Sequence, residues 1–81
     1  MKVYKINSMK YKTIPDDFEA VTQIRYNSPG TLSKIYNRGD KIDVSFYAHV
    51  KGVAPGQSAV FYEGDNVIGG GVIYNSRIDN I

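Results

Sequence analysis

Apolar and polar residues alternate along most of this 81-residue chain, and turn-forming residues interrupt the alternation at short intervals. In the segment 41–47, Ile42, Val44 and Phe46 alternate with polar neighbours. A period of two is typical of a β-strand that is buried on one face. The segment 18–26 follows the same period, and the residues of its apolar face are Phe18, Ala20, Thr22 and Ile24.

The rest of the chain also favours strands. Further strands are predicted at 2–6, 31–36, 58–64 and 66–74, and the last two are apolar enough to be expected under cover on both faces. Turns are predicted at 27–30, 37–40, 54–57 and 63–66. No segment has a credible helical period, because Pro15 interrupts the nearest candidate. The sequence therefore predicts an all-β fold, a small closed or partly open antiparallel β-barrel.

Three consecutive glycines, at positions 69 to 71, have two interpretations. A phosphate-binding loop requires glycines that lead into a helix, whose N-terminal amides face the anion. Here a predicted strand follows them. We therefore favour a bulge or a sharp bend of the barrel, where another backbone passes closely.

Length and composition predict one domain over residues 1–81, with a barrel core at about 7–74 and a polar tail at 75–81 that lacks a pairing pattern. Without cysteine, the chain has no disulfide and no thiolate ligand. A net charge of +2 does not by itself indicate nucleic acid. No run has the length of a membrane span and the N-terminus has no signal-peptide pattern, so a cytoplasmic location is expected, with no membrane partner.

Candidate catalytic groups are sparse. His49 is the one histidine and follows an alternating strand, so a surface or turn position is favoured over a general base. Asp16 and Asp17 adjoin a proline and are interpreted as a solvated turn, and the strand serines Ser33, Ser45 and Ser58 have no visible partner. No metal-ligand spacing occurs. The chain alone is expected to have no catalytic residue, no metal and no cofactor.

A binding surface is the remaining prediction. Arg25 and Tyr26 end one strand, and Lys34, Tyr36 and Arg38 follow on the next strand and its turn. Cationic groups beside aromatic rings hold phosphates and stack bases. The alternative is that these residues are ordinary solvent-facing strand ends.

The segment "GVAPGQSAVFYEGDNVIGGGVI" (52–73), preceded by "IRY" (24–26), resembles the C-terminal domain of the bacterial tRNA-specific 2-thiouridylases. That family combines an Ala-Pro-Gly-Gln turn, an apolar strand with Phe-Tyr, a Gly-Asp turn and a Gly-Gly-Gly strand, with an Arg-Tyr pair upstream. The resemblance covers about residues 7–74. It implies a barrel similar to the second domains of translation elongation factors.

The resemblance also implies a longer parent enzyme, of which this chain would be an excised domain, although a free-standing paralogue remains an alternative. In the family, an ATP-pyrophosphatase domain adenylates the wobble uridine of tRNA, and a cysteine persulfide then supplies the sulfur. This sequence contains neither the nucleotide loop nor a cysteine. The resemblance therefore implies that ATP and the chemistry belong to absent catalytic and central domains, with a sulfur-relay protein as a further partner.

The family motifs imply three tRNA-binding residues here, namely Arg25, Tyr26 and Gln57. The alternatives are a surface cation, a tyrosine at the core edge and a glutamine that caps its own loop. Asn27 stands where the family often has another arginine, which weakens the expected phosphate contact. The leading hypothesis is a non-catalytic tRNA-docking domain, and the alternative is a structural or protein-interaction barrel without direct RNA contact.

Overall fold

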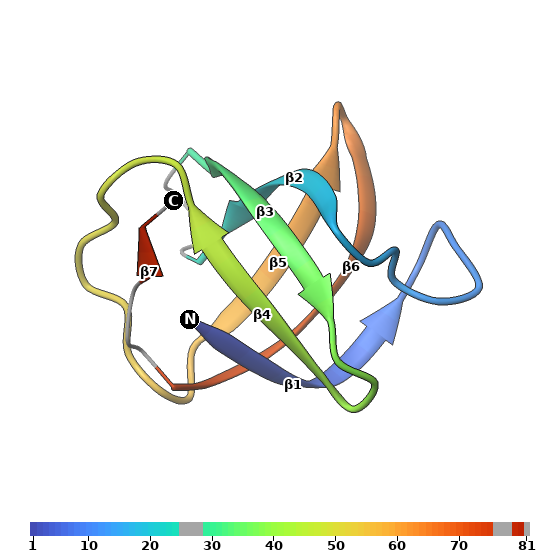
Figure 1. The fold of residues 1–81 in the computed structure, drawn as a ribbon, viewed down its shortest axis with the longest axis horizontal. Helices are drawn as coiled ribbons and strands as arrows, with labels where there is room; N and C mark the ends of the chain where they lie inside the picture. The colour runs from blue at the N-terminus through green and yellow to red at the C-terminus, as the bar shows by residue number, and fades with distance from the viewer. Residues whose placement is uncertain (25–28, 76–78, 81) are drawn as a thin grey trace.

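The computed structural model of the chain describes residues 1–24, 29–75 and 79–80. None of these residues is helical, as the sequence predicts. The strands are β1 (Lys2–Ser8), β2 (Phe18–Gln23), β3 (Thr31–Asn37), β4 (Lys41–Phe46), β5 (Ser58–Glu63), β6 (Asn66–Asn75) and β7 (Asp79–Asn80). Figure 1 shows them wrapped around one interior.

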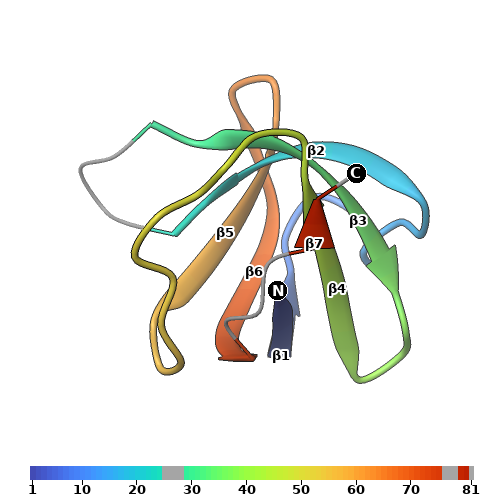
Figure 2. The ribbon, with the colours of Figure 1, turned by 60° about the vertical axis from the view of Figure 1, so that its left-hand side comes forward.

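The barrel is closed. Its strands pair in the order β1-β6-β5-β2-β3-β4, and an additional antiparallel pairing joins β4 back to β1. Val3 shows the closure directly, because it lies opposite Ile42 of β4 on one side and Ile73 of β6 on the other. Figure 2 shows β1 between these two strands. The sequence prediction of a small antiparallel barrel is confirmed, in its closed form.

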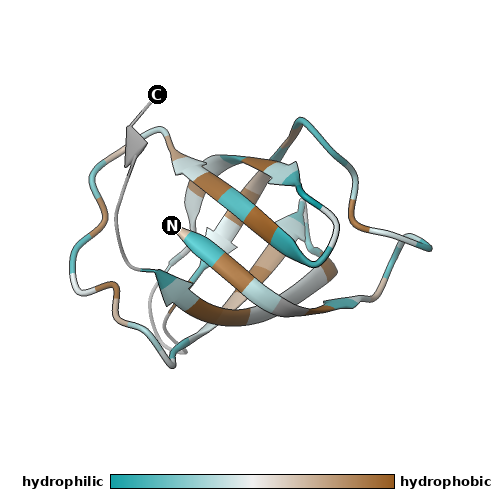
Figure 3. Ribbon diagram, turned by 60° about the horizontal axis from the view of Figure 1, so that its bottom comes forward, coloured by the Kyte–Doolittle hydropathy of each residue, from teal (hydrophilic) through white to brown (hydrophobic). Residues whose placement is uncertain are grey.

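Alternating residues of the strands fill the interior. Ile42, Val44 and Phe46 of β4 are buried, as their period of two predicts. Figure 3 shows the corresponding alternation of hydrophobic and hydrophilic bands along the strands. The expectation that β5 is covered on both faces was wrong, since Ser58 is exposed and Val60 half-buried. A barrel wall has only one dry face, and β5 follows the same alternation as its neighbours.

Two hydroxyl groups lie inside the apolar core. Thr22 of β2 and Ser33 of β3 are both buried, and their side-chain oxygens are 2.7 Å apart. The Ser33 hydroxyl also donates to the backbone oxygen of Ala20, at 2.8 Å. The sequence showed no partner for Ser33, because the register that places it beside Thr22 is not visible in it. Paired in this way, both hydroxyls avoid the cost of burial without a hydrogen bond.

The three glycines lie within β6, so the interpretation as a close backbone approach is confirmed. A Cβ atom on Gly70 would lie 2.5 Å from the backbone oxygen of Ala59 in β5. One on Gly71 would lie 2.5 Å from the backbone oxygen of Tyr4 in β1. Both neighbouring pairings also contain register shifts beside these positions. Glycine lets the wall bend here because no side chain separates the three backbones.

The two ends of the chain take more part in the structure than the sequence suggests. Met1 is buried, and its backbone nitrogen and oxygen bond to the oxygen and nitrogen of Val44, at 3.1 and 2.8 Å. The barrel therefore begins before residue 7, where the predicted core starts. The sequence of the polar tail shows no pairing pattern, yet part of the tail pairs in the structure. Its residues Asp79 and Asn80 form β7, which pairs in parallel with the end of β4.

Candidate nucleic-acid interface

Gln57 lies at the end of the predicted turn before β5. Gly56 has a φ of 93°, and the Gln57 nitrogen donates to the Ala54 oxygen at 3.3 Å, in agreement with a type II turn. Hydrogen bonds of 2.8 Å from the Gly56 nitrogen to Ile73 and from the Ile73 nitrogen to the Gln57 oxygen hold the turn against β6. The position of Gln57 is thus fixed by the barrel itself.

The side chain of Gln57 caps its own turn. Its Oε1 accepts a hydrogen bond of 2.8 Å from the Ala54 nitrogen. This is the structural alternative considered for the residue. Its Nε2 has no partner within the part of the chain that the structure describes, and the side chain is half-buried. The amide can therefore still donate to a ligand while its oxygen stabilises the loop.

The other two predicted tRNA-binding residues, Arg25 and Tyr26, lie outside the described residues, as does Asn27. They fall in the connection between β2, which ends at Gln23, and β3, which begins at Thr31. That they act together with Gln57 in one tRNA-binding site therefore stays a prediction.

Lys34 and Tyr36 lie on the outer face of β3, because Ser33 and Ile35 point into the core. The Lys34 ammonium forms an ion pair of 2.9 Å with Asp17. The hydrogen bond that the ammonium donates to this carboxylate, together with the negative charge of the carboxylate, raises the pKa of Lys34. Lys34 is therefore a paired surface cation rather than an isolated one.

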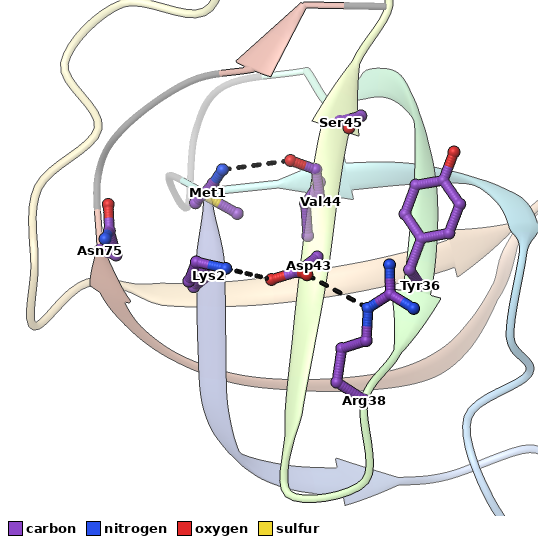
Figure 4. Close-up of a pocket in the computed structure, with 8 residues that line it drawn as sticks. All are labelled: Met1, Lys2, Tyr36, Arg38, Asp43, Val44, Ser45 and Asn75. Atoms are coloured by element: carbon purple, nitrogen blue, oxygen red, sulfur yellow. Dashed lines mark hydrogen bonds and ion pairs between the residues drawn. The ribbon is translucent and has the colours of Figure 1, made fainter.

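A polar hollow lies beside Tyr36, on the outside of β1, β3 and β4 (Figure 4). Its volume is about 540 Å³. The carboxylate of Asp43 bridges two cations there, with Oδ1 at 2.9 Å from Lys2 Nζ and Oδ2 at 3.3 Å from Arg38 Nε. The guanidinium carbon of Arg38 also lies 5.4 Å from the centre of the Tyr36 ring. Tyr36 and Arg38 were predicted from sequence, whereas Lys2 and Asp43 were not.

Strand register explains that omission. Lys2 and Asp43 are 41 positions apart in sequence but directly opposite in the β1–β4 pairing. Both alternate outward on strands that the sequence predicts. To predict their contact from sequence, one would have to predict that the barrel closes by pairing β1 with β4.

The three charged side chains of the polar hollow keep a net positive charge even though its carboxylate is ionised. Partial burial acts to raise the pKa of Asp43, but the hydrogen bonds and charges of Lys2 and Arg38 outweigh it and lower that pKa below its ordinary value. One carboxylate thus stays ionised between two cations, which leaves a net charge of +1 from these three groups. The arrangement suits a ligand that carries an anionic group next to a planar ring, because the Arg38 guanidinium and the Tyr36 ring lie side by side.

The catalytic candidates His49 and Asp16 occupy exposed positions outside the strands. His49 is exposed after the end of β4, as predicted. Asp16 is exposed and accepts a hydrogen bond of 2.8 Å from the Asn37 nitrogen, in a turn role. Within residues 1–24, 29–75 and 79–80, no three His, Cys, Asp or Glu side chains gather where they could hold a metal ion. The same residues include no helix of the length and apolarity needed to cross a membrane.

Lys10, Tyr11 and Glu63 form a separate charged cluster that serves the fold. The Glu63 Oε1 accepts from both Lys10 and Tyr11, at 2.7 Å each. These hydrogen bonds lower the pKa of Glu63 and raise that of Lys10. They join the long connection after β1 to the β5–β6 hairpin, so the cluster is a surface tie between two loops.

Comparison with known proteins identifies the family. The sequence profile described as the aminomethyltransferase beta-barrel domain matches residues 1–73. A tRNA-specific 2-thiouridylase MnmA of Cytophaga hutchinsonii is 55% identical over 58 residues, which is 72% of this chain and 16% of that protein. The protein of the same description from Amoebophilus asiaticus is 47% identical over 74 residues, 90% of this chain and 20% of that protein.

A third relative, the tRNA-specific 2-thiouridylase MnmA of Carboxydothermus hydrogenoformans, is 41% identical over 71 residues, 84% of this chain and 19% of its own length. The chain thus spans no more than a fifth of the length of these relatives. Its closed antiparallel barrel and the profile match agree with each other. The chain belongs to the aminomethyltransferase beta-barrel domain family, and within it resembles the barrel found in tRNA-specific 2-thiouridylases.

Proposed function

We propose that this chain is the non-catalytic, tRNA-contacting barrel of a cytoplasmic enzyme that 2-thiolates the wobble uridine of tRNA. The observation that carries the proposal is the 55% identity to a protein described as a tRNA-specific 2-thiouridylase. ATP-dependent adenylation and sulfur transfer from a cysteine persulfide take place on other domains of that enzyme. A sulfur-relay protein delivers the sulfur to them.

In this proposal, Arg25, Tyr26 and Gln57 contact the tRNA. The Arg25 guanidinium donates to a phosphate, and Tyr26 stacks on a base or donates to a backbone oxygen. Gln57 donates through Nε2 while its Oε1 continues to cap the turn. The rigid attachment of that turn to β6 supports the last role, since the donor needs little ordering on binding.

The test compares tRNA affinity of the wild-type chain with Arg25→Ala, Tyr26→Ala and Gln57→Glu. The glutamate variant keeps an oxygen for the Ala54 nitrogen and removes the Nε2 donor, so the turn should stay intact. Lys12→Ala is the matched control, because Lys12 is exposed in the connection after β1. We expect a severalfold loss of affinity in the three variants and none in the control. Wild-type affinity in all three would remove the roles of these residues.

A second candidate function is docking to another protein domain, favoured by a shallow groove of about 350 Å³ along the glycines of β6. Its lining includes Met9 and Val67, which are 64% and 39% exposed. Hydrogen exchange of the parent enzyme, with and without tRNA, separates the two functions. Protection by tRNA that spares this barrel would favour the docking role over the RNA-contacting one.

A further inference from the structure

Two tyrosines form an exposed aromatic pair near one end of the barrel. Tyr4 of β1 and Tyr74 of β6 lie with their ring centres 5.2 Å apart and their planes at 72°. They are 38% and 37% exposed. Each ring is held in place by the other while a large part of its surface faces solvent. Because the two planes are far from parallel, such a pair offers a planar ligand the face of one ring for stacking and the edge of the other as a side wall.

A cation lies beside this pair. Lys41 of β4 is directly opposite Tyr4 in the β1–β4 register. Lys41, Asp40 and the two tyrosines line a surface hollow of about 600 Å³. An aromatic surface flanked by a lysine is the combination that single-stranded nucleic acids use, with the base on the ring and the phosphate on the cation.

The aromatic hollow and the polar hollow of Lys2, Arg38 and Asp43 lie next to each other on the same face of the barrel. Lys2 and Tyr4 are two residues apart on β1, and Asp43 and Lys41 are two residues apart on β4, so each pair shares the outer face. The charged side chains of the two hollows are three cations, Lys2, Arg38 and Lys41, and two carboxylates, Asp40 and Asp43. These side chains sum to a net charge of +1 (three minus two), and Tyr36 adds a third aromatic ring to the surface.

We propose that this outer face of β1, β4 and β6 binds unpaired nucleotides of the RNA that the barrel contacts. A base stacks on one ring of the Tyr4–Tyr74 pair and contacts the edge of the other, Lys41 holds the adjacent phosphate, and Lys2 and Arg38 hold the next one, oriented by Asp43. This inference rests on the proposed function and adds a contact surface distinct from Arg25, Tyr26 and Gln57. Cations interleaved with aromatic rings favour RNA over an apolar protein surface as the occupant.

The first experiment is an NMR titration of the 81-residue chain with hexauridylate and, separately, with an RNA duplex of six base pairs. NMR detects weak binding, which is expected for a small contact surface. We expect hexauridylate to shift the amide signals of Tyr4, Lys41 and Tyr74, and to give intermolecular contacts between uracil protons and the two rings. The duplex, whose bases are already stacked, should shift these signals much less.

Variants then measure the contribution of each group. Tyr4→Leu and Tyr74→Leu should each weaken hexauridylate binding by about fivefold or more, which is the lower end of base–aromatic stacking. Lys41→Gln should reduce the slope of log affinity against log salt concentration by about 0.7. The matched controls are Tyr47→Leu and Lys12→Gln. Tyr47 is 44% exposed and follows the last residue of β4, whereas Lys41 is the first residue of that strand, so Tyr47 lies away from the aromatic hollow.

The outcomes separate this inference from the proposed function. If tRNA binds and only the Gln57, Arg25 and Tyr26 variants weaken it, the inference is overturned and the proposed function stands. If only the Tyr4, Tyr74 and Lys41 variants weaken it, the inference stands and the three assigned residues lose their roles. A folded chain that binds neither tRNA nor hexauridylate overturns both. Protection of the tyrosine pair by another protein domain, without an effect of RNA, also overturns the inference.

Discussion

Two walls of the barrel are built in different ways. In the glycine wall, formed by β5, β6 and the part of β1 beside Gly69–Gly71, three backbones approach so closely that side chains are excluded. Both pairings of this wall contain register shifts. In the charged wall, formed by β2, β3 and β4, the register runs without interruption. Its outer face carries long polar side chains such as Lys34 and Arg38.

This difference separates the residues that determine the curvature of the barrel from the residues whose side chains are available for binding. The glycine wall bends because glycine permits close contacts between main chains. The charged wall presents cations and rings at the regular spacing of an uninterrupted strand register, while its inner face contributes to the core. β1 connects the two walls, because it pairs with β6 on one side and with β4 on the other, and its outer residues Lys2 and Tyr4 adjoin the charged surface.

The largest effect is expected from filling the glycine wall. Gly70→Val should destabilise the barrel by about 3 kcal/mol, because its Cβ would lie 2.5 Å from the Ala59 backbone oxygen, which cannot move without breaking the β5–β6 ladder. Ser45→Val, on the outer side of β4, is the matched control and should change stability by no more than about 0.5 kcal/mol. Urea unfolding of both variants measures the contrast. Equal costs at the two positions would contradict the distinction between the walls.

Local patterns in the sequence predicted much of this architecture, and long-range pairing limited the rest. The alternation of Ile42, Val44 and Phe46 and the turn at Gly64 are local, so the strands and hairpins could be predicted. The β1–β4 closure, the pairing of β7 and the meeting of Lys2 with Asp43 depend on contacts between distant segments. No local propensity encodes these contacts, since they follow from how the sheet coils and closes.

The candidate site shows the same division. Gln57 could be located because its turn has a distinctive local sequence, and its capping bond was one of the alternatives considered. Tyr36 and Arg38 were also predicted, as a cation beside a ring. The Tyr4–Tyr74 pair was missed because its members come from strands far apart in sequence. Only the closed barrel brings them to one surface.

An intermediate effect is expected inside the charged wall, where side chains rather than backbones fix the packing. Ser33→Ala should cost about 1–3 kcal/mol, because it leaves the buried Thr22 hydroxyl without its partner and removes the bond to the Ala20 oxygen. Thr22→Val should cost less, since Ser33 can still donate to Ala20. The double variant should cost less than the sum of the two, as urea unfolding of the four proteins would measure. Additive costs would show that the hydroxyls do not interact.

The smallest effect is expected on the outside of the charged wall. Asp43→Asn should lower the free energy of unfolding at pH 7 by roughly 0.5–1 kcal/mol, because Lys2 and Arg38 are 40% and 52% exposed and water screens both ion pairs. Asp40→Asn is the control, since Asp40 is exposed at the β3–β4 turn. Thermal unfolding in low salt, where screening is weakest, measures the difference best.

The pH dependence of that difference tests its cause. The pKa of Asp43 is lower in the folded chain than its ordinary value of 3.8, so the folded state holds the ionised carboxylate more favourably than the unfolded state does. Its stabilising contribution is therefore complete above that value and is lost as the pH falls through the lowered pKa. Wild type and Asp43→Asn should differ at pH 7 and converge in acid. A difference that persists at the lowest pH would mean that Asp43 stabilises the charged wall by packing and not by its charge. The charged wall would then depend on close packing, as the glycine wall does.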